Sequence, residues 1–396
     1  MKLSERIGLI KSSATLAVST KCKQLNAQGI RIINLSAGEP DFDTPENIKQ
    51  AAIEAINNGF TKYTAVGGID ALKEAIVKKF RQDNSIEYGK ENICVSDGAK
   101  HTLFNLFQVL LDKGDEVILP APYWVSYEAG IRYAGANPII VPTAPTGYKI
   151  LPEALEEKIT SRTKMVVLNS PSNPVGSAYS KAEIEKLTEC ALKHNLFIVS
   201  DEIYEKIVYD GFKPVSPASL SDEAKRKTLT VNGVSKTYSM TGWRIGWVGA
   251  DSEIVKAMTK LQSQSTSNPC SIAQAAAVEA LNGSQKSVEI MVDAFKERRD
   301  YFYNELKNIK GINCFKPNGA FYLFPDISGL YGRRFNGRKI SSSIDFANLL
   351  IDEAKVASVP GIGFGDDNSL RFSYAASMED IKEAVESIKS VVSQLE

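Results

Sequence analysis

A lysine and an arginine lie close together in a segment of small and hydroxyl-bearing residues, 231–246. Lys236 directly follows Ser235, and Arg244 lies eight residues further along the chain. A lysine amine forms a Schiff base with an aldehyde, and a hydroxyl together with a guanidinium binds phosphate. The three residues therefore suit an aldehyde that carries a phosphate group. A solvated lysine and a surface arginine would give the same local pattern.

Small, polar and aromatic residues follow other short apolar runs that are typical of buried strands. These residues are Gly98, Ala99 and Lys100 after 93–96, Trp124 after 116–119, Asn173 after 165–168, and Asp201 and Tyr204 after 196–200. In a parallel sheet, ligands bind beyond the carboxyl ends of the strands. We therefore expect these side chains to gather at one edge of a sheet.

Apolar runs alternate with helical patterns over the central part of the chain, which predicts an α/β fold. The expected strands are 93–96, 116–119, 138–141, 165–168, 196–200, 229–231 and 245–248, with helices such as 102–111 and 181–194 between them. Alternation of this kind indicates a largely parallel sheet covered by helices on both faces.

Further helix and strand patterns lie on both sides of this central region in the sequence. Residues 15–28 predict a helix and 31–35 a short strand, whereas 282–309 contain a long amphipathic helix. We divide the chain into an N-terminal segment at 1–45 that forms part of a small domain, a large domain at 46–285, and an interdomain helix with a C-terminal small domain at 286–396.

Composition excludes several classes of protein. Lys+Arg and Asp+Glu both total 47 of 396 residues, so no general field favours nucleic acid or an anionic membrane. There is no apolar run of about 20 residues, which a membrane span requires, and no signal peptide is expected. Five cysteines without a CxxC pair, and only two histidines, argue against a metal site. Scattered thiols suit a cytoplasmic protein.

The segments 234–236 (Val-Ser-Lys) and 240–246 (Met-Thr-Gly-Trp-Arg-Ile-Gly) resemble the cofactor-lysine region of class I aminotransferases. The segments 38–42 (Gly-Glu-Pro-Asp-Phe) and 169–176 (Asn-Ser-Pro-Ser-Asn-Pro-Val-Gly) extend the resemblance. The nearest likeness is to the I-beta branch of aspartate aminotransferases, which use pyridoxal 5'-phosphate (PLP). It implies fold type I, with a mostly parallel seven-stranded sheet in the large domain and a smaller α+β domain built from both termini. It also implies a homodimer with active sites at the interface.

The resemblance implies a role for each cofactor-binding residue. Gly98, Ala99, Lys100, Ser235 and Arg244 would hold the phosphate, together with Tyr63 of the neighbouring subunit. Trp124 would stack on the ring, and Asn173 and Tyr204 would form hydrogen bonds with its phenolic oxygen. Asp201 would face the ring nitrogen, and Lys236 would form the Schiff base with the aldehyde. Simpler alternatives remain for some of them. Asp201 could be a helix N-cap, and Tyr63 a half-buried packing residue.

For the substrate, the resemblance implies contacts with Gly38, Trp124 and Asn173, and with Arg371 at the α-carboxylate. Lys100 would bind a second carboxylate, and Lys11 matches a position that accompanies use of prephenate. The expected reaction converts L-aspartate and 2-oxoglutarate to oxaloacetate and L-glutamate by a ping-pong mechanism through a Lys236 Schiff base. The alternatives are arogenate-forming transamination of prephenate, an aromatic or neutral amino acid aminotransferase, a C–S lyase, or a non-catalytic ligand sensor.

Overall fold

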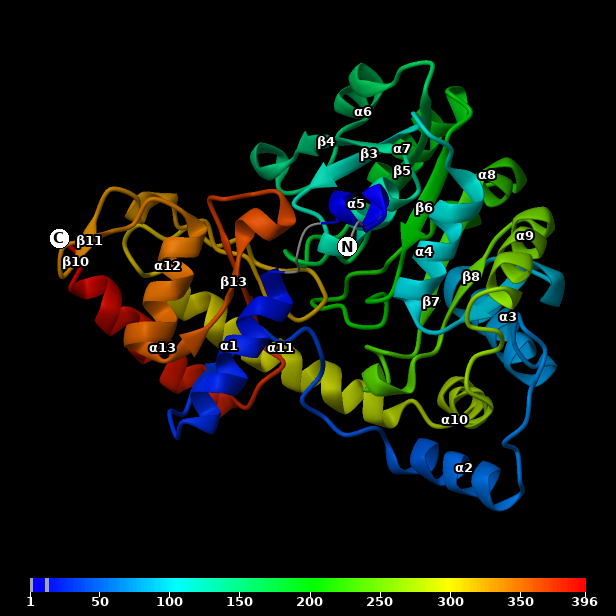
Figure 1. Ribbon diagram of the computed structural model, residues 1–396, viewed down its shortest axis with the longest axis horizontal. Coiled ribbons are helices and arrows are strands. Elements are labelled where there is room, and N and C mark those ends of the chain that lie inside the picture. The colour runs from blue at the N-terminus through cyan, green and yellow to red at the C-terminus, as the bar shows by residue number, and fades with distance from the viewer. Residues whose placement is uncertain (1–2, 11–13) are drawn as a thin grey trace.

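A seven-stranded sheet forms the centre of the larger half of the protein in the computed structural model, which describes residues 3–10 and 14–396 (Figure 1). The strands follow the order β2-β8-β7-β6-β5-β3-β4, and β8 alone runs antiparallel to its neighbours. Their bounds are β2 (Ile93–Ser96), β3 (Glu116–Ala121), β4 (Asn137–Pro142), β5 (Thr163–Asn169), β6 (Phe197–Asp201), β7 (Thr228–Gly233) and β8 (Gly246–Gly249).

Side chains alternate between the two faces of this sheet, as the period of a strand requires. Val167 and Val199 belong to one apolar core, whereas Val166 and Ile198 belong to another. Helices cover both faces, so the central strands carry apolar residues on both of their faces. The helices of this half are α2 (Glu46–Asn57), α3 (Asp70–Asn84), α4 (Ala99–Leu110), α5 (Val125–Tyr133), α6 (Pro152–Lys158), α7 (Lys181–Lys193), α8 (Asp222–Lys227), α9 (Ser252–Ser263) and α10 (Ser271–Asn282).

The antiparallel strand β8 returns the chain to the edge of the sheet formed by the carboxyl ends of β5, β6 and β7, hereafter the functional edge. Asn169, Asp201 and Val231 lie side by side near the carboxyl ends of β5, β6 and β7. Gly246, the first residue of β8, lies opposite both Gly233 and Ser96. The segment before β8 therefore reaches the same edge as the segment after β7.

The smaller half is built from both ends of the chain. β1 (Ile33–Asn34) pairs with β12 (Val356–Ala357), and β14 (Leu370–Ser373) lies between β13 (Val359–Pro360) and β9 (Tyr322–Leu323). The other elements are α1 (Ala14–Ala27), the hairpin β10 (Arg334–Phe335) and β11 (Arg338–Lys339), α12 (Ser343–Leu349) and α13 (Met378–Ser393). α11 (Lys286–Leu306) runs from the region of α10 to this half (Figure 1).

The predicted order of elements is confirmed, and the expected strands of the large sheet all form within two residues of their predicted ends. The predicted strand at 31–35 is shorter, because β1 pairs with β12 over only two residues. The boundaries at 45 and 285 stay a prediction. No helix within residues 3–10 and 14–396 is long and apolar enough to cross a membrane.

Candidate active site

The start of α4 and the guanidinium of Arg244 lie against each other at the functional edge of the sheet. Gly98 precedes α4 with a φ of 86°, and a Cβ there would lie 2.3 Å from Arg244 Nη2. A Cβ on Gly246 would lie 2.2 Å from the backbone nitrogen of Ala99. Both positions therefore require glycine. Free backbone N–H groups at a helix start, next to a guanidinium, form an anion-binding site.

Lys236 follows β7 in a buried turn, next to the buried Ser235. Its Nζ donates a hydrogen bond of 2.6 Å to the carbonyl oxygen of Gly38. Burial lowers the pKa of Lys236 to about 8, against the attraction of Glu39, and the charges of nearby Arg371, Arg244 and Lys100 lower it further. Lys236 therefore has more neutral, nucleophilic amine near neutral pH than a solvated lysine has.

Asp201 ends β6 as a buried carboxyl group that is 3% exposed. The hydroxyl of Tyr127 donates to its Oδ2 at 2.6 Å, and the backbone N–H of Ile203 donates to its Oδ1 at 3.3 Å. Burial raises the pKa of Asp201 to about 6, although both hydrogen bonds oppose that change. Within the described chain, no lysine or arginine forms an ion pair with it. A cationic ring nitrogen would supply the missing partner.

Arg371 lies in β14 and is 2% exposed. Its Nη1 donates to Oδ1 of Asn173 at 3.1 Å, and its Nη2 donates to the carbonyl oxygen of Ser36 at 2.6 Å. Its Nε is buried without a hydrogen-bond partner. In the residues that the structure describes, no carboxylate pairs with this guanidinium. Because buried charges require partners, Arg371 is suited to an incoming carboxylate.

Aromatic rings and Lys100 lie around these charged groups. The hydroxyls of Tyr204 and Tyr322 share a hydrogen bond of 2.8 Å. Lys100 Nζ lies 5.0 Å from the centre of the Trp124 ring. Burial, followed by the charge of Arg244, lowers the pKa of Lys100. A Cβ on Gly38 would lie 3.1 Å from the Tyr322 hydroxyl, so the backbone there passes close to the site.

These contacts link most of the residues that the sequence singled out. The residues so linked are Gly38, Gly98, Ala99, Lys100, Trp124, Asn173, Asp201, Tyr204, Ser235, Lys236, Arg244 and Arg371. Tyr63 does not belong to this linked group, because the residue is 92% exposed on this chain. Lys11 lies outside the described residues.

Sequence reasoning missed two tyrosines that hold the site together. Tyr127 binds Asp201, and Tyr322 binds Tyr204 and faces the guanidinium of Arg371 at 4.7 Å. A weak signal existed for Tyr127, which lies one helical turn after Trp124 at the carboxyl end of a strand. No spacing in the sequence links Tyr322 to Tyr204.

The donor set fits PLP group by group. The helix start with Arg244 and Ser235 suits a phosphate, and the buried carboxyl of Asp201 suits a protonated ring nitrogen. The lowered pKa of Lys236 suits reaction with an aldehyde, and the unpartnered Nε of Arg371 suits a substrate carboxylate. The fold and the site together define an α/β enzyme that uses PLP on amino acids.

The chain belongs to the aminotransferase class I and II family, whose model matches residues 30–388. It is 49% identical to an aspartate aminotransferase of Bacillus sp. (strain YM-2), over 98% of this chain and 99% of that protein. It is 50% identical to a probable aspartate/prephenate aminotransferase of Rickettsia bellii (strain RML369-C), over 96% of each. The solved structure of an aspartate aminotransferase from Thermus thermophilus with maleate gives a TM-score of 0.93 at 42% identity, over 99% of this chain and 100% of that one. The protein is therefore a PLP-dependent aminotransferase, and the fold-type-I prediction is confirmed.

We predict that Tyr127→Phe weakens PLP binding by the apoenzyme and shifts its pH dependence. The charged carboxylate of Asp201 is the form that favours a cationic ring, so affinity should fall as the pH drops through about 6. Removing the Tyr127 donor raises the pKa of Asp201 further, so the fall begins at higher pH. The dissociation constant near neutral pH should rise roughly two- to tenfold. Fluorescence titration of the apoenzyme with PLP measures both effects.

Tyr179→Phe is the matched control, because the buried Tyr179 hydroxyl accepts a hydrogen bond from the Ile150 backbone and touches no site residue. It should lower thermal stability and leave the PLP dissociation constant and its pH dependence unchanged. If both variants weaken PLP binding equally, Tyr127 has no specific role toward Asp201.

Proposed function

We propose that the enzyme transfers the amino group of L-aspartate to 2-oxoglutarate, giving oxaloacetate and L-glutamate by a ping-pong mechanism. The observation that carries the proposal is the presence of two cations, Arg371 and Lys100, that lie near Lys236 and have no carboxylate partner among the described residues. A dicarboxylic amino acid supplies an anion for each. The names of the relatives agree with this substrate, and maleate, which accompanies the Thermus thermophilus enzyme in its solved structure, is itself a dicarboxylate.

Residues at the carboxyl edge of the sheet would hold the cofactor. The backbone at Gly98, Ala99 and Lys100, with the side chains of Ser235 and Arg244, would bind its phosphate, and Trp124 would stack on its ring. Asp201 would keep a proton on the ring nitrogen, while Asn173 and Tyr204 would bond the phenolic oxygen. When bound, PLP supplies an aldehyde that reacts with amines and a ring that draws electrons from the substrate α-carbon.

Lys236 would carry the cofactor between turnovers and move a proton during them. Its pKa of about 8 lets the amine take a proton from the substrate α-carbon and return it to the cofactor carbon. Arg371 would bind the α-carboxylate with help from Asn173, and Gly38 would present backbone to the substrate. Because Arg371 lies in β14 of the smaller half and Lys236 follows β7 of the larger half, both halves must meet around the substrate.

We further propose that the active unit is a homodimer in which Tyr63 completes the neighbour's phosphate site. The exposed ring of Tyr63 supports this, together with exposed apolar side chains nearby in the sequence, at Ile53, Ile56 and Phe60. Exposed apolar groups of this kind mark association surfaces. The proposal places the enzyme in the cytoplasm, where its unpaired cysteines stay reduced.

Transamination of prephenate to arogenate is a second candidate activity. The name of the Rickettsia bellii relative favours it, as does the presence of Lys11 in the sequence. Prephenate also carries two carboxylates, so the same pair of cations, Arg371 and Lys100, would bind it.

We predict that Lys100→Ser lowers kcat/KM for aspartate far more than for alanine. A charge-assisted contact contributes about 1.5–3 kcal/mol, so the loss toward aspartate should be roughly ten- to a hundredfold. Alanine lacks the second carboxylate and should change little. Steady-state kinetics with 2-oxoglutarate as acceptor measures both values. Lys100→Arg keeps the charge and should lose less kcat/KM for aspartate than Lys100→Ser does. Equal losses of kcat/KM for aspartate and alanine would assign Lys100 to the cofactor and remove the basis for a dicarboxylic substrate.

The proposed dimer predicts complementation between a weakened chain and an inactive one. A chain with Tyr63→Phe keeps Lys236, and a chain with Lys236→Ala keeps Tyr63. If Tyr63 acts across the interface, the mixed dimer contains one site in which both residues are intact. Isolated heterodimers, purified with two different tags, should therefore have about half the activity of wild type and one PLP site of wild-type affinity, on the one-in-two count of intact sites. A heterodimer with only the weakened site of the Tyr63→Phe homodimer would show that Tyr63 acts within its own chain.

A further inference from the structure

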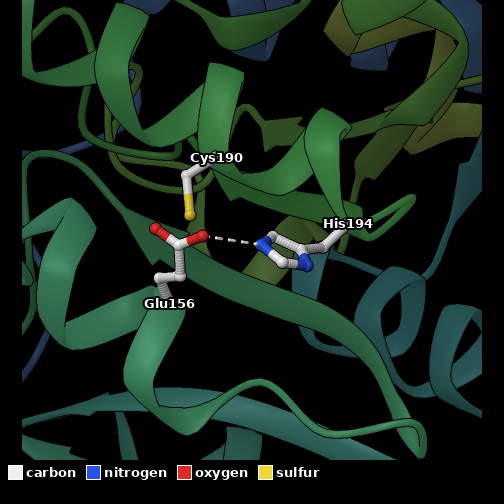
Figure 2. Close-up of side chains that lie close together, drawn as sticks. All are labelled: Glu156, Cys190 and His194. Atoms are coloured by element: carbon white, nitrogen blue, oxygen red, sulfur yellow. Dashed lines mark hydrogen bonds and ion pairs between the residues drawn. The ribbon is translucent and has the colours of Figure 1, made fainter.

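Three side chains with metal-binding atoms meet where α6 packs against α7 (Figure 2). Cys190 and His194 lie four residues apart, at the end of α7 and directly after it, so they share one helix face. Glu156 comes from α6 and points toward both of them (Figure 2). The carboxylate oxygen, the thiol sulfur and the imidazole nitrogen all lie within 4.8 Å of one another.

We propose that Glu156, Cys190 and His194 form a binding site for one divalent transition-metal ion of the zinc type. Tetrahedral bonds of about 2.0–2.3 Å place ligand atoms roughly 3.5 Å apart. Small side-chain rotations from the observed positions reach that separation, because Glu156 ends on a flexible, exposed side chain. One carboxylate, one thiolate and one imidazole leave a fourth position for water. The mixture of sulfur, nitrogen and oxygen ligands favours zinc or cobalt over magnesium or calcium.

The site is open to solvent and lies at the opposite edge of the sheet from Lys236. Glu156 and His194 line a surface depression that also contains Thr163 and Phe197. Thr163 begins β5 and Phe197 begins β6, whereas the PLP site lies at the carboxyl ends of these strands. A bound ion would therefore link α6 to α7 without touching the reacting groups, and its main effect would be on stability.

Metal binding requires a change in protonation and a change in the existing contacts of Glu156. The Cys190 thiol loses its proton to solvent as the metal–sulfur bond forms, and a neutral His194 donates a nitrogen lone pair. Thiolate and carboxylate together balance the charge of a divalent ion. Lys193 at present holds Glu156 Oε1 at 2.5 Å, and His194 Nε2 lies 3.1 Å from the same oxygen. The ion must displace the ammonium group of Lys193, which therefore acts as a competitor.

This proposal departs from the sequence-based expectation that no metal is bound. That expectation was based on the absence of a CxxC pair and on the low number of histidines. The spacing of Cys190 and His194 gives two ligands on one helix face, but Glu156 lies 34 residues before Cys190 and meets it only in the folded protein.

Titration of the PLP-loaded enzyme with Co²⁺ tests the site. Tetrahedral Co²⁺ bound to a thiolate gives visible bands at longer wavelengths than PLP absorption, and we expect one ion per chain that Zn²⁺ displaces. Cys190→Ser and His194→Gln should each lose these bands. Lys193→Met removes the competing ammonium and should tighten binding about two- to fivefold. Cys270→Ser is the matched control, because Cys270 is an exposed thiol in another part of the fold, and it should leave the titration unchanged.

Bound Zn²⁺ should also raise the melting temperature of the wild-type enzyme and of Cys270→Ser, but not that of Cys190→Ser. PLP absorbance of each variant shows that it is folded. Two results would overturn the proposal: Co²⁺ bands that persist in both Cys190→Ser and His194→Gln, or a wild-type enzyme without tetrahedral Co²⁺ bands. The second result would mean that Glu156, Lys193 and His194 form an ordinary ion-pair cluster between two helices.

Discussion

The site depends on four positive charges that are gathered together without enough negative partners, with Arg371 fully buried among them. Lys236, Arg371, Arg244 and Lys100 influence one another closely enough for the last three to depress the pKa of Lys236. Arg371 keeps a buried Nε without a partner, and the backbone carbonyl of Gly38 is what binds the amine of Lys236. An arrangement of this kind is costly until anions enter. The phosphate of PLP and the carboxylates of a substrate supply those anions, so the positive charge of the site is best compensated when both are bound.

Three features of the fold bring these charges together. The antiparallel direction of β8 returns the chain to the edge where β7 ends, which brings the segment that carries Arg244 to the segment that carries Ser235. Glycines at 98 and 246 let the guanidinium and the first residues of α4 approach to contact. β14 carries Arg371 in from the smaller half, where Asn173 of the larger half accepts its hydrogen bond. The substrate would therefore bind where both halves meet.

Local pattern predicted the sheet and much of the site, because residues such as Asp201 and Asn173 lie at or shortly after the ends of buried apolar strands. It could not predict contacts between distant residues. Tyr127 lies 74 residues from Asp201, and Tyr204 lies 118 residues from Tyr322, so neither pair has a signature in the sequence. The Glu156 cluster depends in the same way on the packing of two helices. Tyr63 shows a different limit, because its proposed partner belongs to another subunit.

A substrate panel tests most directly the claim that Arg371 and Lys100 bind the two carboxylates of a dicarboxylic substrate. The purified, PLP-loaded enzyme would be assayed for kcat/KM with aspartate, glutamate, alanine and phenylalanine, each against 2-oxoglutarate or, for glutamate, oxaloacetate. The account predicts that aspartate and glutamate exceed alanine and phenylalanine by at least about tenfold, the value of one charge-assisted contact. Equal or greater efficiency with alanine or phenylalanine would contradict it.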